Sequence, residues 1–191
     1  MLKLSVQLAY ITGIALGDGN LSRPNGRATR LRVSCDNKYS QLITEIKNAL
    51  TIVFPTNKVA TVIRKGSNCT DVSVYSNQLN TIIPWAVGAG TKIEQSAHVP
   101  KWILDDPEFS KACLKGLLQT DGSIYFDRKY IMVNFTNLIK PLIDDVYKMI
   151  ETLEFKPKLY QTTQKNGNIK YVVRVSKNVQ RFIDVIGLAK N

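Results

Sequence analysis

Apolar positions recur at helical spacing in two stretches of the chain, residues 5–18 and 106–121. In each stretch an apolar residue returns every three or four positions, which is the period of one buried helix face. Ser5 and Asp106 precede the two patterns as helix-capping residues, and a glycine follows each pattern. The sequence therefore predicts two helices of similar length.

Polar and apolar residues alternate after each of these helices, in residues 30–35 and 130–135. Alternation with a period of two predicts strands that have one buried and one solvated face. In both halves of the chain the pattern then predicts a helix, two strands joined by a glycine-containing turn, and a last helix. These further elements are expected at residues 37–50, 58–65, 69–76 and 77–87, and again at 137–153, 158–165, 169–176 and 178–188.

The two halves are also similar residue by residue. Moving the chain by 100 positions lays residues 31–83 on 131–183 with ten identities in 53 positions, where chance gives about three. We therefore predict an α+β protein built from two pseudo-symmetric αββαββα halves. Their expected bounds are 1–90 for the N-terminal half, 91–106 for a linker and 107–191 for the C-terminal half.

The charge of the chain favours an anionic partner. Its 191 residues include 26 Lys and Arg against 15 Asp and Glu, for a net charge of +11, and nucleic acid is the commonest partner of such an excess. A hydrophobic content of 44% excludes a disordered tail. The single histidine, His98, gives no support for zinc catalysis or for a Ser-His-Asp triad.

Cysteine use and hydropathy indicate the compartment. Cys35, Cys69 and Cys113 form no C-x-x-C pair, and their odd number closes no disulfide framework, which favours a reducing compartment. No apolar run reaches the roughly 20 residues that span a bilayer, and the N-terminus lacks a small-residue cleavage site. We expect a soluble intracellular protein, in the cytoplasm or an organelle matrix, with no membrane partner.

A short motif occurs in both predicted helices, as ITGIALGDG at residues 11–19 and as LKGLLQTDG at residues 114–122. The positions that share one helical face, four residues apart, are Gly13, Gly17, Gly116 and Thr120. Glycine inside a helix costs about 1 kcal/mol relative to alanine, so we expect these positions to let the two helices pack closely. Asp18 and Asp121 would then lie side by side at the helix ends.

That placement of Asp18 and Asp121 is electrostatically unfavourable. A helix C-terminus disfavours a carboxylate by about 0.3–1 kcal/mol, and two neighbouring carboxylates repel each other. A divalent cation that is held by both aspartates, by water and by phosphate oxygens of a bound polyanion would remove the conflict. The alternative is that Asp-Gly at a helix end is a common turn without further function.

The paired motifs resemble those of single-chain LAGLIDADG homing endonucleases, whose two halves pack through the motif helices. The resemblance implies a curved four-stranded antiparallel sheet in each half and a saddle in the DNA major groove. It implies that Asp18 and Asp121 bind the catalytic metal, Mg²⁺, for which Mn²⁺ or Ca²⁺ can substitute in binding. Leu16 and Gln119 stand where the family motif has its earlier acidic residue.

The function implied by this resemblance is that of an intron-encoded meganuclease, a hydrolase that cuts one phosphodiester per strand across the minor groove and leaves short 3′ overhangs. A cationic residue should stand near each acid, and the matches are Lys92 and, more weakly, Lys190. A glutamine often found at the end of the second strand is absent, since Cys35 and Phe135 occupy those places.

DNA contacts are expected from the outward positions of the strands and from the loops after the first helix of each half. The predicted DNA-contacting residues are Ser22, Arg23, Arg27, Arg30, Arg32, Ser34, Thr61, Ile63, Lys65, Thr70, Tyr125, Asp127, Arg128, Tyr130, Met132, Asn134, Gln161, Thr163, Lys165, Lys170 and Arg174. The two halves contribute chemically different sets, which predicts an asymmetric double-stranded target.

Two other functions remain open. Proteins that resemble this family can act as intron RNA maturases, which use a similar surface to assist splicing without cutting. A non-cleaving DNA-binding regulator is the second alternative, and it would not need Asp18 or Asp121. In each case we expect a monomer with no obligate protein partner.

Overall fold

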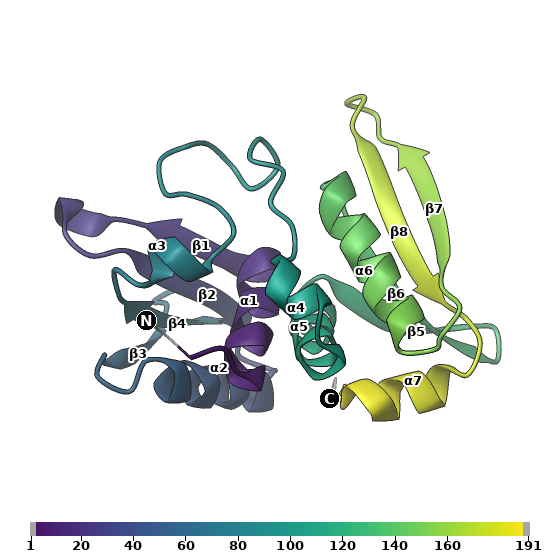
Figure 1. The fold of residues 1–191 in the computed structure, drawn as a ribbon, viewed down its shortest axis with the longest axis horizontal. Coiled ribbons are helices and arrows are strands. Elements are labelled where there is room, and N and C mark those ends of the chain that lie inside the picture. The colour runs from purple at the N-terminus through teal and green to yellow at the C-terminus, as the bar shows by residue number, and fades with distance from the viewer. Residues whose placement is uncertain (1–2, 189–191) are drawn as a thin grey trace.

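The computed structural model describes residues 3–188, and its elements fall into two halves with one order (Figure 1). The N-terminal half comprises α1 (Val6–Asp18), β1 (Gly19–Ser22), the 3-10 turn η1 (Pro24–Gly26), β2 (Arg30–Asp36), α2 (Ser40–Val53), β3 (Val59–Ile63), β4 (Cys69–Tyr75) and α3 (Leu79–Ile82). The C-terminal half comprises α4 (Lys101–Leu104), α5 (Pro107–Thr120), β5 (Gly122–Asp127), β6 (Tyr130–Asn137), α6 (Lys140–Thr152), β7 (Lys158–Thr163), β8 (Ile169–Val175) and α7 (Val179–Ile186).

Each half contains one antiparallel four-stranded sheet, with strand order β1-β2-β4-β3 in the first and β5-β6-β8-β7 in the second. The predicted α+β class and the doubled αββαββα order are therefore confirmed. One element is shorter than expected, because α3 ends at Ile82 instead of continuing to residue 87. Pro84 disfavours helical geometry at the residue before it, and Ile83 is accordingly extended.

The two motif helices form the centre of the molecule. The Ser5 hydroxyl caps α1 by accepting from the Leu8 N–H at 3.2 Å, and the Asp106 carboxylate caps α5. A Cβ atom on Gly13 would collide with the Cys113 carbonyl, and one on Gly116 would lie 2.5 Å from the Tyr10 carbonyl oxygen. Backbone therefore packs on backbone, which only glycine permits at these positions.

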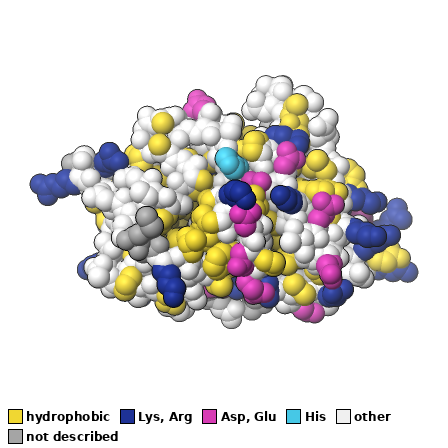
Figure 2. Space-filling model, viewed as in Figure 1, with side chains coloured by type: hydrophobic (Ala, Val, Ile, Leu, Met, Phe, Trp, Pro, Cys, Tyr) yellow, Lys and Arg dark blue, Asp and Glu magenta, His cyan; other side chains and the backbone are white. Residues whose placement is uncertain are grey.

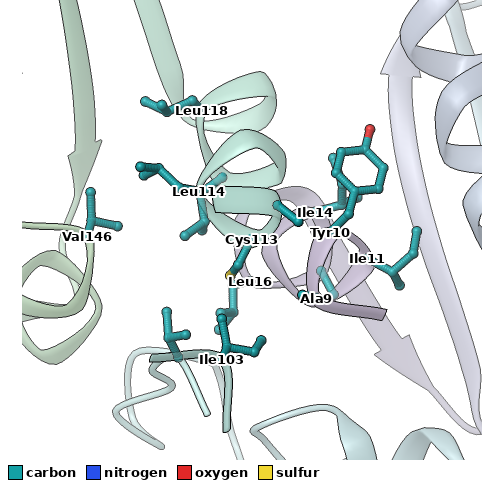
Figure 3. Packing of buried hydrophobic residues seen from close by; sticks show 14 of the residues in the cluster. Ala9, Tyr10, Ile11, Ile14, Leu16, Ile103, Cys113, Leu114, Leu118 and Val146 are labelled. Carbon is teal, nitrogen blue, oxygen red and sulfur yellow. The ribbon is translucent and has the colours of Figure 1, made fainter. Parts of the chain in front are cut away.

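The core is continuous from one half to the other through α1 and α5. In Figure 3, Leu114 and Leu118 of α5 point toward Val146 of α6, and Ile11 of α1 points to the opposite side. Cys113 and Ile14 are completely buried between the two helices. Each motif helix thus gives one face to its own half and one to its partner helix. None of the described helices is long and apolar enough to cross a membrane.

The turn between the last two strands differs in length between the two sheets. The turn between β3 and β4 is closed by the Arg64 N–H on the Cys69 carbonyl, and that between β7 and β8 by the Gln164 N–H on the Asn168 carbonyl. The second turn is therefore one residue shorter. Because successive side chains of a strand point to opposite faces, positions that are 100 apart in β4 and β8 face opposite sides.

Candidate active site and nucleic-acid interface

Asp18 and Asp121 stand where each motif helix meets its sheet. Asp18 is the last residue of α1, and Asp121 is the C-cap of α5. The two helices stay in contact down to Gly17 and Thr120, the residues that precede the acids. Asp121 also lines a cleft of about 340 Å³ together with Gly17 and Lys92. Asp18 is exposed and Asp121 is half-buried, so both remain within reach of a bound molecule.

Lys92 brings a cation to the same place. It belongs to the segment 83–100, which arches from α3 in the N-terminal half to α4 at the centre (Figure 1). Its Nζ donates to the carbonyl oxygens of Ala15 at 3.3 Å and Leu16 at 2.8 Å, and also to that of Gly17. These are the last carbonyls of α1, so the ammonium offsets the negative end of that helix.

The surroundings of Lys92 are apolar on one side and acidic on the other. The Trp85 ring centroid lies 5.3 Å from Nζ. Burial lowers the pKa of Lys92, while the charges of Asp121 and Asp18 act in the opposite direction. The charge of Lys92 therefore interacts with those of both acids. The second predicted lysine, Lys190, lies outside the described residues.

Asn137 is a site residue that the sequence analysis did not single out. Its Nδ2 donates to Asp121 Oδ2 at 2.8 Å. Its Oδ1 accepts from the N–H groups of Leu138 at 2.8 Å and Ile139 at 3.0 Å, which fixes the orientation of the amide. An Asn at the junction of a strand and a helix is the signal that could have identified it, because Asx side chains bind the next backbone N–H groups.

The strand pairing of β1 with β2 and of β5 with β6 corrects one of the two positions, Cys35 and Phe135, that the sequence analysis matched to the family glutamine. Gly19 pairs with Val33, and Gly122 pairs with Phe135. The residue two positions further along is Cys35 in the first half and Asn137, not Phe135, in the second. Phe135 is buried in the core instead. A side-chain amide thus stands at this place in the C-terminal half, whereas Cys35 has a pKa raised to about 11 by burial and by the charge of nearby Asp18.

The oxygen donors at the acid pair suit a hard divalent cation, provided that other groups complete its coordination. Carboxylate and carbonyl oxygens are the groups that Mg²⁺ prefers, and Mg²⁺ is commonly held by one or two carboxylates plus substrate phosphates. Among residues 3–188, no three His, Cys, Asp or Glu side chains gather as a metal cluster. The residues therefore fit a cation whose coordination is completed by phosphate and water.

The outward face of the N-terminal sheet centres on Asp71. Its Oδ1 accepts from the Ser34 hydroxyl at 2.6 Å, and its Oδ2 from Arg64 Nε at 2.9 Å. Arg32 lies on the same face, with Nη1 3.9 Å from Asp71 Oδ2. At the end of the sheet Arg30 Nε donates to the Ser22 hydroxyl at 3.1 Å. This face therefore combines three arginines with one neutralised carboxylate.

The outward face of the C-terminal sheet has no acid at its centre. Arg174 Nε donates to Asn134 Oδ1 at 3.1 Å, and Asn134 Nδ2 donates to the Tyr125 hydroxyl at 3.2 Å. The Arg174 guanidinium lies 5.0 Å from the Tyr160 ring centroid. Lys170 lines the cleft of Asp121. The two faces are chemically different.

Five of the residues expected on the outward faces point to the helix-covered side, and their orientation is corrected here. They are Thr61, Ile63, Thr70, Gln161 and Thr163, which pair with Val72, Thr70, Ile63, Tyr171 and Ile169. Thr70 is buried on the inner strand β4, whereas Thr61 and Ile63 on the edge strand β3 are exposed. The alternation of β3 and β7 runs one residue out of phase with the expectation, and the longer β3–β4 turn reverses Thr70 relative to Lys170.

The other expected contact residues lie on the outward faces or at hairpin ends. Tyr125, Asp127, Tyr130, Met132 and Asn134 share one face by their cross-strand pairing. Lys65 and Lys165 are in the turns after β3 and β7, Arg23 and Arg27 flank η1, and Arg128 follows β5. Figure 2 shows Lys and Arg side chains gathered at both ends of the long axis, where the β1–β2 and β5–β6 hairpins lie in Figure 1.

A larger cleft, of about 710 Å³, lies beside the other ends of α1 and α5. Val6, Tyr10 and Glu108 line it together with residues of α2. Val6 and Asp18 are the first and last residues of α1, which is roughly 18 Å at 1.5 Å per residue. This cleft contains neither acid of the pair, so the candidate active site is the smaller one.

Two family models match the chain, one in each half. A LAGLIDADG-like domain matches residues 108–187, and a WhiA LAGLIDADG-like domain matches residues 7–72. Each matched region contains nearly all of one motif helix, α5 or α1. The doubled architecture is thus present in the family comparison as well as in the fold.

Solved structures with a similar fold include the homing endonuclease I-DmoI in complex with DNA and Mn. It has a TM-score of 0.67 and 18% identity over 97% of this chain and 98% of that chain. The N-terminal LAGLIDADG domain of DUF199/WhiA has a TM-score of 0.63 and 13% identity over 97% of this chain and 84% of that chain. At these identities the likeness establishes the fold.

A sequence relative is the tRNA-splicing ligase RtcB of Methanopyrus kandleri, which is 24% identical over 201 residues. The match covers 94% of this chain and 20% of the ligase. The chain therefore spans about a fifth of that relative.

Proposed function

The chain belongs to the LAGLIDADG family, and from that premise we propose that it is a site-specific endonuclease that cuts one phosphodiester on each strand of a DNA duplex. The observation that carries the proposal is the pair Asp18 and Asp121, contributed by the two halves at the same end of two packed helices. Two acids, one from each half, allow each half to serve one strand. We do not transfer the ligase activity of the Methanopyrus relative to this chain, because the match covers only 20% of that protein.

The two sheets supply the binding surface in this proposal. A two-stranded ribbon fits the major groove, where outward side chains reach base edges and cations reach phosphates. The net charge of +11 and the arginines on both outward faces support a polyanionic substrate. The I-DmoI structures with a similar fold hold DNA. Because the two faces differ, the bound sequence is asymmetric.

Chain residues have distinct tasks in cleavage. Asp18 and Asp121 would hold Mg²⁺, which when bound supplies a stronger nucleophile from water and stabilises charge on the leaving oxygen. Asn137 keeps Asp121 in one orientation through its 2.8 Å hydrogen bond. Lys92, coupled to both acids, offsets the negative charge that develops on the phosphate. Lys92 is thus a candidate catalytic residue for both strands.

A non-cleaving DNA-binding protein is the second candidate function. The specific observation in its favour is Lys92, whose ammonium already offsets the α1 carbonyls and lies near both acids. With that cation present, the acid pair is tolerated without a metal. An RNA-binding maturase would use the same surface and would likewise leave DNA intact.

One selection experiment separates these functions. Duplexes from a randomised pool are incubated with the protein and Mg²⁺, and cut molecules are recovered and sequenced. The proposal expects one recurrent asymmetric site cut on both strands, and no cutting by the double variant Asp18→Asn/Asp121→Asn, which still binds that site. Binding of a defined duplex without cutting would favour the second candidate, and tight binding of folded RNA alone would favour the maturase.

A further inference from the structure

We propose that Arg64, held by Asp71 and Ser34 on the outward face of the N-terminal sheet, is a specificity-determining residue that reads a guanine. The inference rests on the proposed function, since it requires that this face contacts duplex DNA. Arg64 is absent from the residues that the sequence predicts to contact DNA, because the predicted alternation places its neighbours Ile63 and Lys65 on the outward face. The proposal is supported by the position of the Arg64 guanidinium over the sheet, by its Nη1–Nη2 end, which has no further hydrogen bond among the described residues, by the ionised carboxylate of Asp71, and by the different residues at the matched positions of the C-terminal sheet.

The Arg64 guanidinium lies over the middle of the sheet although the residue follows the edge strand β3. Nε donates to Asp71 Oδ2 on β4 at 2.9 Å, and Nη2 donates to the Ser34 hydroxyl on β2 at 2.9 Å. Both bonds draw the side chain from the edge across the two inner strands. A cation at the centre of a sheet that lies in the major groove faces base edges, whereas a cation at its rim faces phosphates.

One edge of the guanidinium is left for a ligand. The bonds to Asp71 and Ser34 use Nε–H and Nη2–H, the donors along one side of the planar fork. The end formed by Nη1 and Nη2 has no further hydrogen bond within residues 3–188, and the side chain is 41% exposed. Two parallel N–H donors match the O6 and N7 acceptors of guanine. Cytosine would present an amino donor there and is excluded.

Asp71 orients the arginine and does not itself read a base. Its Oδ1 accepts from Ser34 at 2.6 Å, and its Oδ2 already accepts from Arg64. Partial burial raises the pKa of Asp71, but the hydrogen bonds from Arg64 and Ser34 and the charges of Arg64 and Arg32 outweigh it and lower the pKa. The carboxylate therefore stays ionised and fixes the guanidinium in one orientation.

The C-terminal sheet lacks this arrangement at the matched positions. The turn closures align Arg64 with Gln164. The pairing of the last two strands aligns Asp71 with Lys170, and the pairing of the inner strands aligns it with Val172. Neither an arginine nor a carboxylate stands there. The fixed guanine should consequently appear in the half-site bound by the N-terminal sheet and not at the mirror position of the other half-site.

The test is a binding selection without Mg²⁺ from a duplex pool randomised over the site, carried out on the wild type, Arg64→Lys and Asp71→Asn. The wild type should select an invariant guanine in one half-site. Arg64→Lys keeps the charge but cannot form two parallel bonds, so preference for that guanine should fall by roughly ten- to a hundred-fold. Asp71→Asn should also weaken the preference, and it should bind unrelated duplexes more tightly because one negative charge is gone.

Lys65→Ala is the matched control, since Lys65 is the next residue and lies in the turn. It should weaken binding of all duplexes alike without a change in base preference. Retention of the same guanine by Arg64→Lys, or a wild type that binds duplexes without any preferred base, would overturn the reading by Arg64. A wild type that binds no duplex would instead overturn the proposed function.

Discussion

The two halves share one architecture but use matched acidic residues for different contacts. Glu45 of α2 accepts from Lys115 and from Gln119 Nε2, the latter at 2.9 Å, so it ties the N-terminal half to α5. Asp145 occupies the equivalent place on α6 and accepts from the Val99 backbone N–H at 2.8 Å, so it ties down the connecting segment. The two halves therefore share a fold but attach their second helices through different contacts.

Glu45 and Asp145 make different contacts because the motif helices that they face carry different side chains. Lys115 and Gln119 of α5 correspond to Thr12 and Leu16 of α1 in the repeated motif. The Thr12 hydroxyl donates to the Leu8 carbonyl of its own helix, and Leu16 is apolar. Asp145 therefore has no donor on α1 to match Lys115. The two acids stand at matched positions of the repeated motif, but the helices that carry them make different contacts.

The largest effect should come from the acids themselves, and it tests whether each half serves one strand. Asp18→Asn and Asp121→Asn should each lower cutting of one strand by about a hundred- to a thousand-fold, and they should affect opposite strands. Strand-specific labelling of a selected duplex measures this, and each variant should give a duplex that is nicked in one strand. Loss of both cuts in either single variant would mean that the halves do not act separately.

Packing between the halves should be the next most sensitive feature. Gly13→Ala and Gly116→Ala each place a Cβ atom against backbone of the partner helix, so each should lower the free energy of unfolding by about 1–3 kcal/mol. Urea unfolding measures the loss. Lys111→Ala on the surface of α5 is the control, for which about 0.5 kcal/mol or less is expected. Equal stability of the glycine variants and the control would show that the helices need no close approach.

A smaller and one-sided effect is expected at the position where the halves differ next to the acids. Asn137→Ala removes the 2.8 Å bond to Asp121, so it should slow the cut that depends on Asp121 by about ten-fold. Cys35→Ala is the counterpart in the other half, and it should slow the cut that depends on Asp18 by a smaller factor. Pre-steady-state cleavage rates for each strand decide it. An equal effect of Asn137→Ala on both strands would contradict a positioning role toward Asp121.

The smallest effect concerns Asp145 and depends on pH. Burial raises the pKa of Asp145, and although the Val99 N–H and the charge of His98 oppose this, the net shift is upward. The carboxyl of Asp145 therefore keeps its proton to a higher pH in the folded state than in the unfolded chain, where an Asp has a pKa of about 3.9. The free energy of unfolding consequently falls as the pH rises from about 3.9 through the raised pKa of the folded state. Asp145→Asn keeps an acceptor for Val99 without this dependence.

Urea unfolding of the wild type and Asp145→Asn from pH 3.5 upward gives the comparison. The wild type should lose free energy of unfolding relative to the variant as pH rises above about 4. A difference that stays constant across pH would mean that Asp145 does not titrate with folding.

Much of the fold could be predicted because it follows from local rules. Helical periodicity and the caps Ser5 and Asp106 give α1 and α5, and the small residues four apart in each motif give their contact. Which side chains of each strand point outward could not be derived from local rules. One additional residue in the β3–β4 turn exchanges the inward and outward positions of β4 relative to those of β8. The hydrogen bonds of Asn137 and Arg64 join distant segments, and no local pattern specifies such contacts.

The central claim is that Asp18 and Asp121 bind divalent cation, with the coordination completed by DNA phosphate. Mn²⁺ titration of the protein followed by electron paramagnetic resonance tests it most directly, alone and with a selected duplex, for the wild type and Asp18→Asn/Asp121→Asn. The account predicts weak uptake by the protein alone, much tighter uptake by the wild-type complex, and loss of that gain in the double variant. Equal Mn²⁺ uptake by the two complexes would contradict it.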